Sequence, residues 1–577
     1  MPALRTTVAL CLAALLAIPA AHAQAPAAQP TLILTNGRIV TVDSARPEAQ
    51  AVAIAGDRIL AVGTSAEIAR LATPATRVID LEGKLAIPGF IEGHGHYMGL
   101  GQAKLQLDLT TARTWDDIVA MVAEAAKKAA PGEWILGRGW HQEKWERQPV
   151  PMVEGNPVHA ALSAASPNNP VYLTHASGHG SFVNAKAMEL ARIDRNTKNP
   201  DGGEIVHDAQ GNPTGLLRET AQGLASPDRV TERMPAAERE ALSRRIVQLA
   251  GQDALSKGVT AFHDAGTGFR TIDFFKRMAD EGALPVRLYV MVRGEALARM
   301  DSLLPRYLMN GYGNGFLTVR SIKRQIDGAL GSHGAWLLEP YADLPRSTGL
   351  ALEQPASLAE LAKVAIKHGY QVNTHAIGDR ANREVLDVYE RTFAANPAKR
   401  DLRWRIEHAQ HIETPDVPRF RQLGVIASMQ GIHTISDAPW LAGKLGAERA
   451  ARESYLFRTL WDGGVIVTNG TDAPVEDVDP IASFYGMVAR KSRDGSVFTP
   501  EQRLTRTEAL QAYTLNNAYA GFQEKDLGSI TPGKYADIVV LSKDIMRVPE
   551  DEIPTAKTVY TIVGGVVKYD AARAVTP

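Results

Sequence analysis

Four apolar segments of this 577-residue chain each end in a residue that can bind a metal ion. The first, residues 88–96, ends in the pair His94-Gly95-His96, and in a β-strand residues two apart point to the same face. The other three end at His375, His408 and Asp472, and a further apolar segment carries Lys323. Imidazole is the commonest protein ligand for a transition metal, so we interpret the His-x-His pair as half of a metal site.

Helical patterns such as residues 357–368 and 414–423 separate these segments. Alternating strands and helices predict an α/β fold with parallel strands. We count eight strands, over residues 87–96, 259–264, 286–292, 319–326, 371–375, 402–408, 425–429 and 465–472. Eight such units predict a (β/α)8 TIM-like barrel, in which the carboxyl ends of all strands meet at the active-site face. The residues that we expect to converge there are His94, His96, Lys323, His375, His408 and Asp472.

In their order and spacing these motifs resemble the amidohydrolase superfamily of metal-dependent hydrolases. The branch that they resemble is amidohydrolase family 3, with proteins similar to N-substituted formamide deformylases. The matching stretches include residues 88–96, 178–184, 202–219, 258–266, 323–331, 375–381, 405–410, 470–475, 504–517 and 528–541. The resemblance covers nearly the whole chain after the N-terminal segment.

Lys323 has two interpretations. In related amidohydrolases a lysine at the fourth strand end reacts with CO₂, and the carbamate bridges two metal ions. The resemblance therefore implies a carboxylated Lys323 in a binuclear site. The alternative is a solvated lysine, or one paired with Asp327, in a site with one metal ion.

The donor set contains only nitrogen and oxygen, which suits Zn²⁺ and also Mn²⁺, Fe²⁺, Co²⁺ or Ni²⁺. We expect one or two divalent ions, with zinc the first choice. A bound ion lowers the pKa of its water from 15.7 to roughly 7 and so supplies metal-bound hydroxide. Asp472 is the expected catalytic acid/base, although it could instead cap the turn before Ala473-Pro474.

Four other residues are candidates for substrate binding: Trp140, His179, Gln430 and His433. His179 lies in a motif that the resemblance assigns to the substrate pocket, and Gln430 and His433 follow the seventh predicted strand. Trp140 could line an apolar pocket, but an aromatic residue in the core is the more general case.

The chain begins with the pattern of a secretory signal peptide over residues 1–23. Arg5 precedes a short apolar stretch, and Ala21-His22-Ala23 is a small-x-small cleavage site. The apolar stretch is short for a membrane span. We therefore expect an exported protein, periplasmic or secreted, without a membrane anchor after cleavage. The single cysteine, Cys11, lies in this segment, so the mature chain would contain no disulfide.

Alternating apolar and polar residues near both ends predict one small β-sandwich, built from residues 24–86 and 526–577, around a barrel over residues 87–525. Two unrelated flanking modules are the alternative. Residues of about 99–227 would form an insertion after the first barrel strand. A structureless loop of that length is implausible, so we expect a subdomain with strands near 133–140, 171–175 and 182–184.

We expect a metal-dependent hydrolase that cleaves a non-peptide C–N bond, of amide or N-formyl/N-acyl type, in a small molecule. An esterase or lactonase on the same site is one alternative, and a non-catalytic binding or regulatory protein is another. There are 63 Lys and Arg against 64 Asp and Glu, and no basic run, so nucleic acid is not an expected partner. A homo-oligomer is possible.

Overall fold

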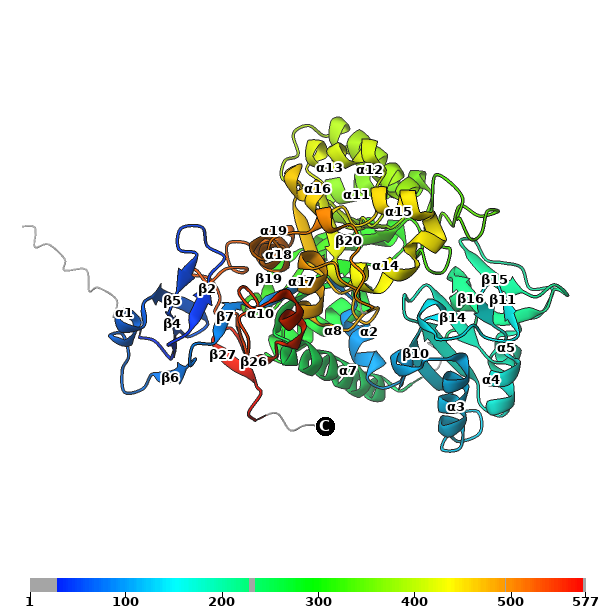
Figure 1. Cartoon of the computed structure of the whole chain (residues 1–577), viewed down its shortest axis with the longest axis horizontal. Helices are drawn as coiled ribbons and strands as arrows, with labels where there is room; N and C mark the ends of the chain where they lie inside the picture. Colours follow the sequence, from blue (N-terminus) through cyan, green and yellow to red (C-terminus); the bar gives the residue numbers. More distant parts are fainter. Residues whose placement is uncertain (1–28, 228–233, 493, 574–577) are drawn as a thin grey trace, which may run out of the picture.

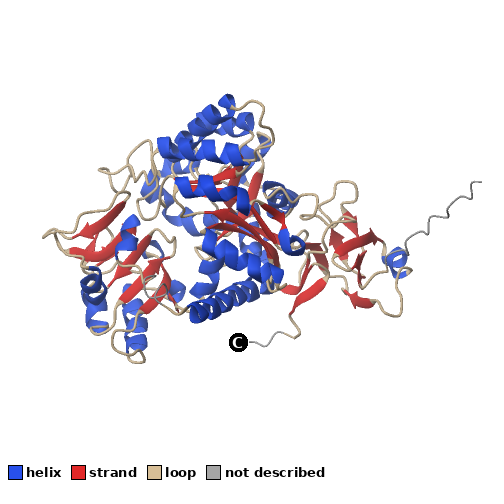
Figure 2. Ribbon diagram, turned by 180° about the vertical axis from the view of Figure 1, so that it is seen from behind, coloured by secondary structure: helices blue, strands red, loops and turns tan. Residues whose placement is uncertain are grey.

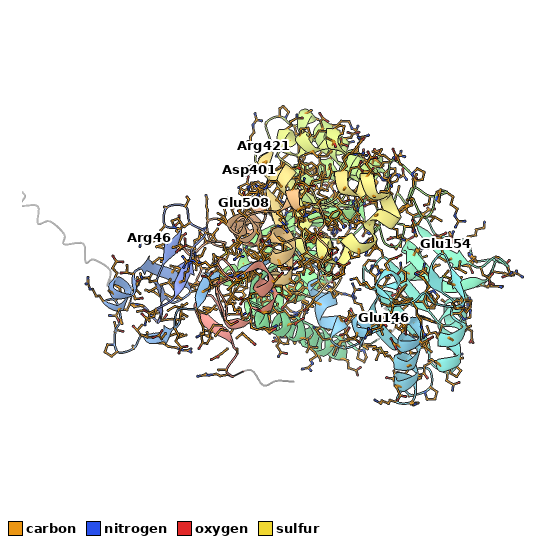
Figure 3. All side chains as sticks on the ribbon, viewed as in Figure 1. Arg46, Glu146, Glu154, Asp401, Arg421 and Glu508 are labelled. Atoms are coloured by element: carbon orange, nitrogen blue, oxygen red, sulfur yellow. The ribbon has the colours of Figure 1, made fainter. Side chains whose placement is uncertain are left out.

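The computed structural model describes residues 29–227, 234–492 and 494–573. The predicted signal peptide, residues 1–23, lies outside the described residues. The molecule is elongated, with a barrel in the middle, strands from both chain ends on one side and the segment after the first barrel strand on the other (Figure 1). Figure 3 labels Arg46 in the part that contains the strands of the chain ends, and Glu154 in the segment after the first barrel strand. Among the described helices, none combines the length and apolar character needed to cross a membrane.

The centre is a nearly closed barrel of eight parallel strands, as predicted. In spatial order the strands are β8 (Phe90–Gly95), β17 (Val259–Thr267), β18 (Arg287–Val292), β20 (Leu317–Gln325), β21 (Gln371–Ala376), β22 (Arg405–His408), β23 (Ile426–Gln430) and β24 (Val467–Gly470). At the remaining seam the backbone N–H of Asp472 donates to the carbonyl of His94 over 2.8 Å, and that of His96 donates to the carbonyl of Ala473 over 2.6 Å. Strand order along the barrel thus follows strand order along the chain.

Helices surround the barrel strands on the outside (Figure 2). The predicted helix over residues 357–368 is α11 (Pro355–His368), which has proline in its first turn and ends at Gly369 with a φ of 73°. The predicted helix over 414–423 is a 3₁₀ turn followed by α13 (Val417–Leu423). The other helices of this layer are α2 (Tyr97–Ala103), α7 (Ala236–Ser256), α8 (Phe269–Asp280), α9 (Leu297–Tyr307), α12 (Asp379–Ala395), α14 (Gly431–Leu445), α15 (Ala447–Glu453), α16 (Phe457–Asp462), α17 (Pro480–Val488), α18 (Arg506–Tyr513) and α19 (Leu515–Ala520).

Two predicted strands have different bounds in the structure. The strand predicted over 87–96 is divided at Gly89, because β7 (Leu85–Pro88) pairs with strands of the chain ends and only β8 enters the barrel. A Cβ atom at Gly89 would lie 2.2 Å from the Thr260 hydroxyl oxygen, so a larger residue at this position would clash with Thr260. The strand predicted over 402–408 starts later, at Arg405, because Asp401 and Arg403 have positive φ angles.

The two ends of the chain share one sheet. Its order is β27-β26-β25-β7-β2-β3, and β25 (Ile538–Leu541) pairs antiparallel with β7. A second sheet has the order β5-β4-β1-β6, and side chains of both sheets join one apolar cluster. The other strands are β1 (Leu32–Thr35), β2 (Arg38–Val40), β3 (Glu48–Ala49), β4 (Ala51–Ala55), β5 (Arg58–Gly63), β6 (Arg77–Asp80), β26 (Thr558–Val563) and β27 (Val566–Asp570). The limits of a β-sandwich domain stay a prediction.

Between β8 and α7 the chain forms a separate six-stranded sheet with the order β15-β16-β14-β13-β10-β9. These strands are β9 (Leu107–Asp108), β10 (Ile135–Trp140), β13 (Val171–His175), β14 (Gly180–Val183), β15 (Gly203–His207) and β16 (Pro213–Glu219). Helices α3 (Trp115–Ala126), α4 (Ala160–Ala165) and α5 (Ala185–Ala191) accompany them, and Leu109, Trp115, Trp140 and Phe182 belong to a local apolar core. The three strands expected here lie close to β10, β13 and β14.

Candidate metal centre

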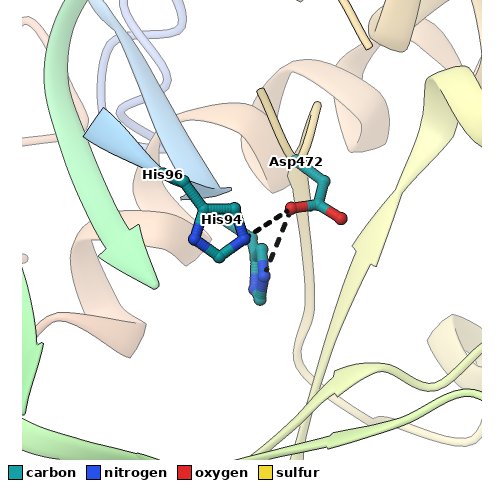
Figure 4. A group of neighbouring side chains, drawn as sticks. All are labelled: His94, His96 and Asp472. Carbon is teal, nitrogen blue, oxygen red and sulfur yellow. Dashed lines mark ion pairs between the residues drawn. The ribbon is translucent and has the colours of Figure 1, made fainter. Parts of the chain in front are cut away.

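His94, His96 and Asp472 meet where the first and last barrel strands end (Figure 4). His94 lies in β8 and His96 directly after it, whereas Asp472 follows β24. The Nε2 atoms of His94 and His96 lie 3.6 and 3.2 Å from Oδ1 of Asp472. One ligand atom from each of the three residues can be chosen so that all lie within 4.8 Å of one another. This spacing suits a single divalent ion.

The other three predicted ligands are adjacent to this group. The ring centroids of His94 and His408 are 4.6 Å apart, and those of His408 and His375 are 4.4 Å apart. The Nζ atom of Lys323, in β20, lies 3.1 Å from Nε2 of His94. The structure therefore brings all six residues together, from the ends of β8, β20, β21, β22 and β24.

The side chains present fit a metal ion. Nε2 of His375 and Oδ1 of Asp472 are buried and have no hydrogen-bond partner among the described residues. Burial lowers the pKa of His375 and His408 well below the usual value, so both imidazoles are neutral and can donate a lone pair. Burial alone would raise the pKa of Asp472, but His96, His94 and His408 hold it well below its usual value. Neutral imidazoles and an ionised carboxylate are the forms that bind divalent ions.

Two further side chains, Glu407 and Gln430, orient histidines of the centre. Oε2 of Glu407 contacts Nδ1 of His94, and Oε1 of Gln430 lies 2.8 Å from Nδ1 of His408. Oδ1 of Asp327 lies 3.4 Å from Nε2 of His375, the atom available to a metal ion, and forms no hydrogen bond with it. Hydrogen bonds at the second ring nitrogen fix the tautomer of a histidine ligand. Gln430, which we expected to bind substrate, therefore has a contact that positions His408.

Sequence reasoning missed the role of Glu407. It precedes His408, and strand alternation would send the two side chains to opposite faces. His408 has a φ of 77°, so the chain leaves the strand conformation there and alternation does not apply. The available signal was an acidic residue within an apolar strand, because a buried carboxylate requires a partner.

Asp327 does not pair with Lys323 in the described part of the chain. Its carboxylate instead accepts three backbone N–H groups, from Trp336, Ile377 and Gly378, over 2.8–3.0 Å. The ion pair considered for Lys323 is therefore not formed. Burial lowers the pKa of the Lys323 amine to about 8, opposed in part by the charge of Glu407.

A cavity of about 780 Å³ opens onto the centre, with His96, Lys323, His375, His408 and Asp472 on its wall. His179 also lines it, and Nδ1 of His179 lies 2.8 Å from Oε2 of Glu219. His433 lines a second pocket of about 50 Å³, which shares His179, His375, His408 and Asp472 with the first.

The remaining substrate-binding candidate, Trp140, is not among the residues that line either space. Its indole N–H donates to the carbonyl of Leu173 over 2.9 Å, and its ring packs in the core of the segment after β8. The structure thus places Trp140 in a core position, the alternative weighed for it from the sequence.

The fold and the donor set together define a metal-dependent hydrolase, and the comparison of sequences agrees. Residues 77–569 match the model of the amidohydrolase family, and the chain belongs to this family.

Two relatives and one solved structure illustrate the similarity. The protein Long After Far-Red 3 of Arabidopsis thaliana is 37% identical over 92% of this chain and 91% of its own length. N-substituted formamide deformylase of Arthrobacter pascens is 29% identical over 93% of this chain and 98% of its own. The crystal structure of an uncharacterised metal-dependent hydrolase from Pyrococcus horikoshii has a TM-score of 0.71 and 26% identity, over 90% of this chain and 99% of that one.

Proposed function

We propose that this member of the amidohydrolase family hydrolyses a non-peptide C–N bond, of amide or N-formyl/N-acyl type, in a small molecule. The observation that carries the proposal is the convergence of six donor residues from five strand ends beside one open cavity. All of them except the buried His94 line the cavity wall. The similarity to a relative named N-substituted formamide deformylase over nearly its whole length supports the choice of bond.

His94, His96, His375, His408 and Asp472 would hold a divalent ion, for which we propose Zn²⁺. A bound ion of this kind polarises a carbonyl oxygen and acidifies water near neutral pH. Asp472 is ionised and lies at the cavity wall, so its carboxylate can accept the proton of the attacking water. The same carboxylate can then deliver the proton to the departing nitrogen, which must leave as a neutral amine.

We further propose that Lys323 is carboxylated. The Nζ ammonium first loses one proton. The neutral amine then adds to CO₂, an N–C bond forms while one C–O π bond of CO₂ breaks, and a second proton leaves, so the charge of the side chain changes from +1 to −1. The lowered pKa of Lys323 supports this step, since a buried amine is deprotonated more readily. The two carbamate oxygens could then bind two ions, which are typically ~3.5–4 Å apart in such sites.

The carbamate is tested by reconstitution of metal-free protein. Below pH 8 the ammonium form of Lys323 predominates, so at a fixed concentration of dissolved CO₂ the rate of activation by zinc should rise with pH up to about 8 and then level off. Lys323→Ala should bind fewer ions and recover part of its activity with added short carboxylic acids. Full metal content and a normal rate in Lys323→Ala would contradict the carbamate and leave a mononuclear hydrolase.

The reaction is tested by incubating metal-loaded enzyme with N-formyl, N-acyl, cyclic amide and ester compounds and measuring product masses. We expect amide cleavage, lost on chelation and restored by Zn²⁺, Mn²⁺ or Co²⁺. Cleavage of esters or lactones alone would favour the alternative enzyme class. Absence of bound metal together with absence of turnover would favour a binding or regulatory protein.

We also propose that the protein is exported to the periplasm or secreted. The mature chain should then begin near Gln24, which N-terminal sequencing of protein from the native cell envelope can test. An intact Met1 or Pro2 on such protein would contradict export.

The partner that we propose is a small-molecule substrate. Light scattering can measure whether the protein forms a homo-oligomer.

A further inference from the structure

Two arginine side chains line the large cavity without a carboxylate partner. Arg138 comes from β10, and Arg293 directly follows β18 in the barrel. Arg138 donates to two carbonyl oxygens, Nε to Pro474 over 3.3 Å and Nη2 to Ala176 over 3.0 Å. Arg293 donates through Nη2 to the amide oxygen of Gln325. Within residues 29–227, 234–492 and 494–573, neither guanidinium forms an ion pair.

The acidic side chains of the cavity already have partners. Glu353 forms a two-point ion pair with Arg324, and Glu219 contacts His179. Asp472 belongs to the metal centre. A divalent ion held there would add further positive charge, so Asp472 cannot serve as a counter-ion for the two arginines.

Holding these two cations without a partner has an electrostatic cost. Burial lowers the pKa of Arg138 to about 10, and only the charge of Asp472 opposes this shift. Burial lowers the pKa of Arg293 as well, with Asp264 and Asp472 opposing it. A chain that needed these residues only for packing could use uncharged side chains at lower cost.

On the basis of the hydrolase function proposed above, we propose that the substrate carries a carboxylate on the part that occupies the large cavity, and that Arg138 and Arg293 bind it. A guanidinium group offers a planar fork of N–H donors that matches a carboxylate. The substrate class is then an N-acylated amino acid or a similar amide acid. The scissile carbonyl lies at the metal centre, and the carboxylate is displaced from it toward the arginines.

The test compares two substrates that differ only in this group. N-formylphenylalanine carries the carboxylate, and N-formyl-2-phenylethylamine lacks it. Metal-loaded wild-type enzyme should prefer the acid in kcat/KM. Arg138→Gln and Arg293→Gln should each lower the ratio of the two kcat/KM values by roughly 10- to 100-fold, the range expected for a hydrogen bond to a charged group. Arg138→Lys and Arg293→Lys, which keep the charge, should recover part of the preference.

The matched control is the double variant Arg324→Gln/Glu353→Gln. It removes an arginine from the same cavity wall together with its carboxylate, so the net charge is unchanged and the ratio should stay within about twofold of wild type. Because Arg138 also donates a hydrogen bond from β10 to Pro474 in the loop after β24, Arg138→Gln could fail to fold. Arg293→Gln then serves as the independent variant. A structural role would lower both rates and leave their ratio unchanged.

The outcomes separate the two proposals. Equal or faster hydrolysis of the neutral compound by wild type would overturn the carboxylate proposal while the hydrolase function stands. If neither compound is hydrolysed, the arginine site is tested by measuring the binding of N-formylphenylalanine to metal-loaded protein by calorimetry. Binding of N-formylphenylalanine that weakens at least tenfold in Arg293→Gln would support the arginine site alone, and binding that is unchanged in this variant would overturn it.

Discussion

At the scale of single residues, substitutions at the metal centre should distinguish the residues that only bind metal from the one that also transfers a proton. Asp472→Asn keeps the size of the side chain and an oxygen ligand but removes the carboxylate that accepts a proton. We expect kcat to fall at least ~100-fold while most of the metal is retained. In contrast, His375→Ala and His408→Ala should lose metal as well as rate. Steady-state kinetics with metal analysis by mass spectrometry measures both quantities.

Asp462→Asn is the control for this change, since Asp462 is an exposed aspartate of the same barrel that pairs with Arg458. It should leave kcat unchanged. If Asp472→Asn kept a near-normal kcat at saturating substrate, the proton would have to move through another group, with His433 the next candidate.

Glu407 affects the metal through His94. Glu407→Gln keeps the shape of the side chain but replaces a carboxylate by an amide at Nδ1 of His94. The imidazole would become a weaker and less firmly oriented ligand, so we expect the metal affinity to fall about 10- to 100-fold. Competition with a chelator of known affinity measures this change. Glu413→Gln, which disturbs only a half-exposed pair with Arg383, should have no effect, and an equal loss in both variants would argue against the role of Glu407.

At the scale of elements, the closeness of β8 and β24 at the barrel seam brings the two halves of the site together. A Cβ atom at Gly470 would lie 2.6 Å from Oε1 of Glu92 and 2.7 Å from the backbone nitrogen of His94. Gly470→Ala should therefore push the strands apart and lower stability by about 1–3 kcal/mol, with loss of metal.

Thermal unfolding monitored by circular dichroism tests this prediction. Gly443→Ala is the matched control, because no atom lies within 4 Å of the added methyl group and the residue is inside helix α14. It should be neutral or slightly stabilising. A Gly470→Ala protein with the wild-type melting temperature and metal content would contradict the tight seam.

At the scale of the whole molecule, a buried ion pair joins the barrel to the C-terminal strands. Nε and Nη2 of Arg287, in β18, donate to the carboxylate of Asp537 over 2.8 and 3.1 Å. Asp537→Ala would leave a buried guanidinium without its partner, at a cost of about 3–5 kcal/mol. The midpoint of thermal inactivation should fall clearly. Glu552→Ala, at an exposed pair with Lys543, should cost at most ~1 kcal/mol, and similar midpoints for the two variants would refute the role of the buried pair.

The sequence by itself determined the class of fold and the residues that gather at its centre. Each ligand lies at or just beyond the end of an apolar strand, and parallel barrel strands bring such positions to one face whatever the loops do. The strands over residues 259–264, 371–375 and 425–429 were predicted closely, because local periodicity suffices to recognise a buried strand.

Only the tertiary structure decided which groups assist the ligands. Glu407 contacts His94 across 313 positions of sequence, and Gln430 of β23 contacts Nδ1 of His408 in the neighbouring strand β22. Arg138 reaches the cavity from a sheet outside the barrel, while Trp140, two residues later in the same strand, packs into the core. Strand periodicity describes one element at a time, whereas the contacts of a buried polar side chain depend on elements that only the folded chain brings together.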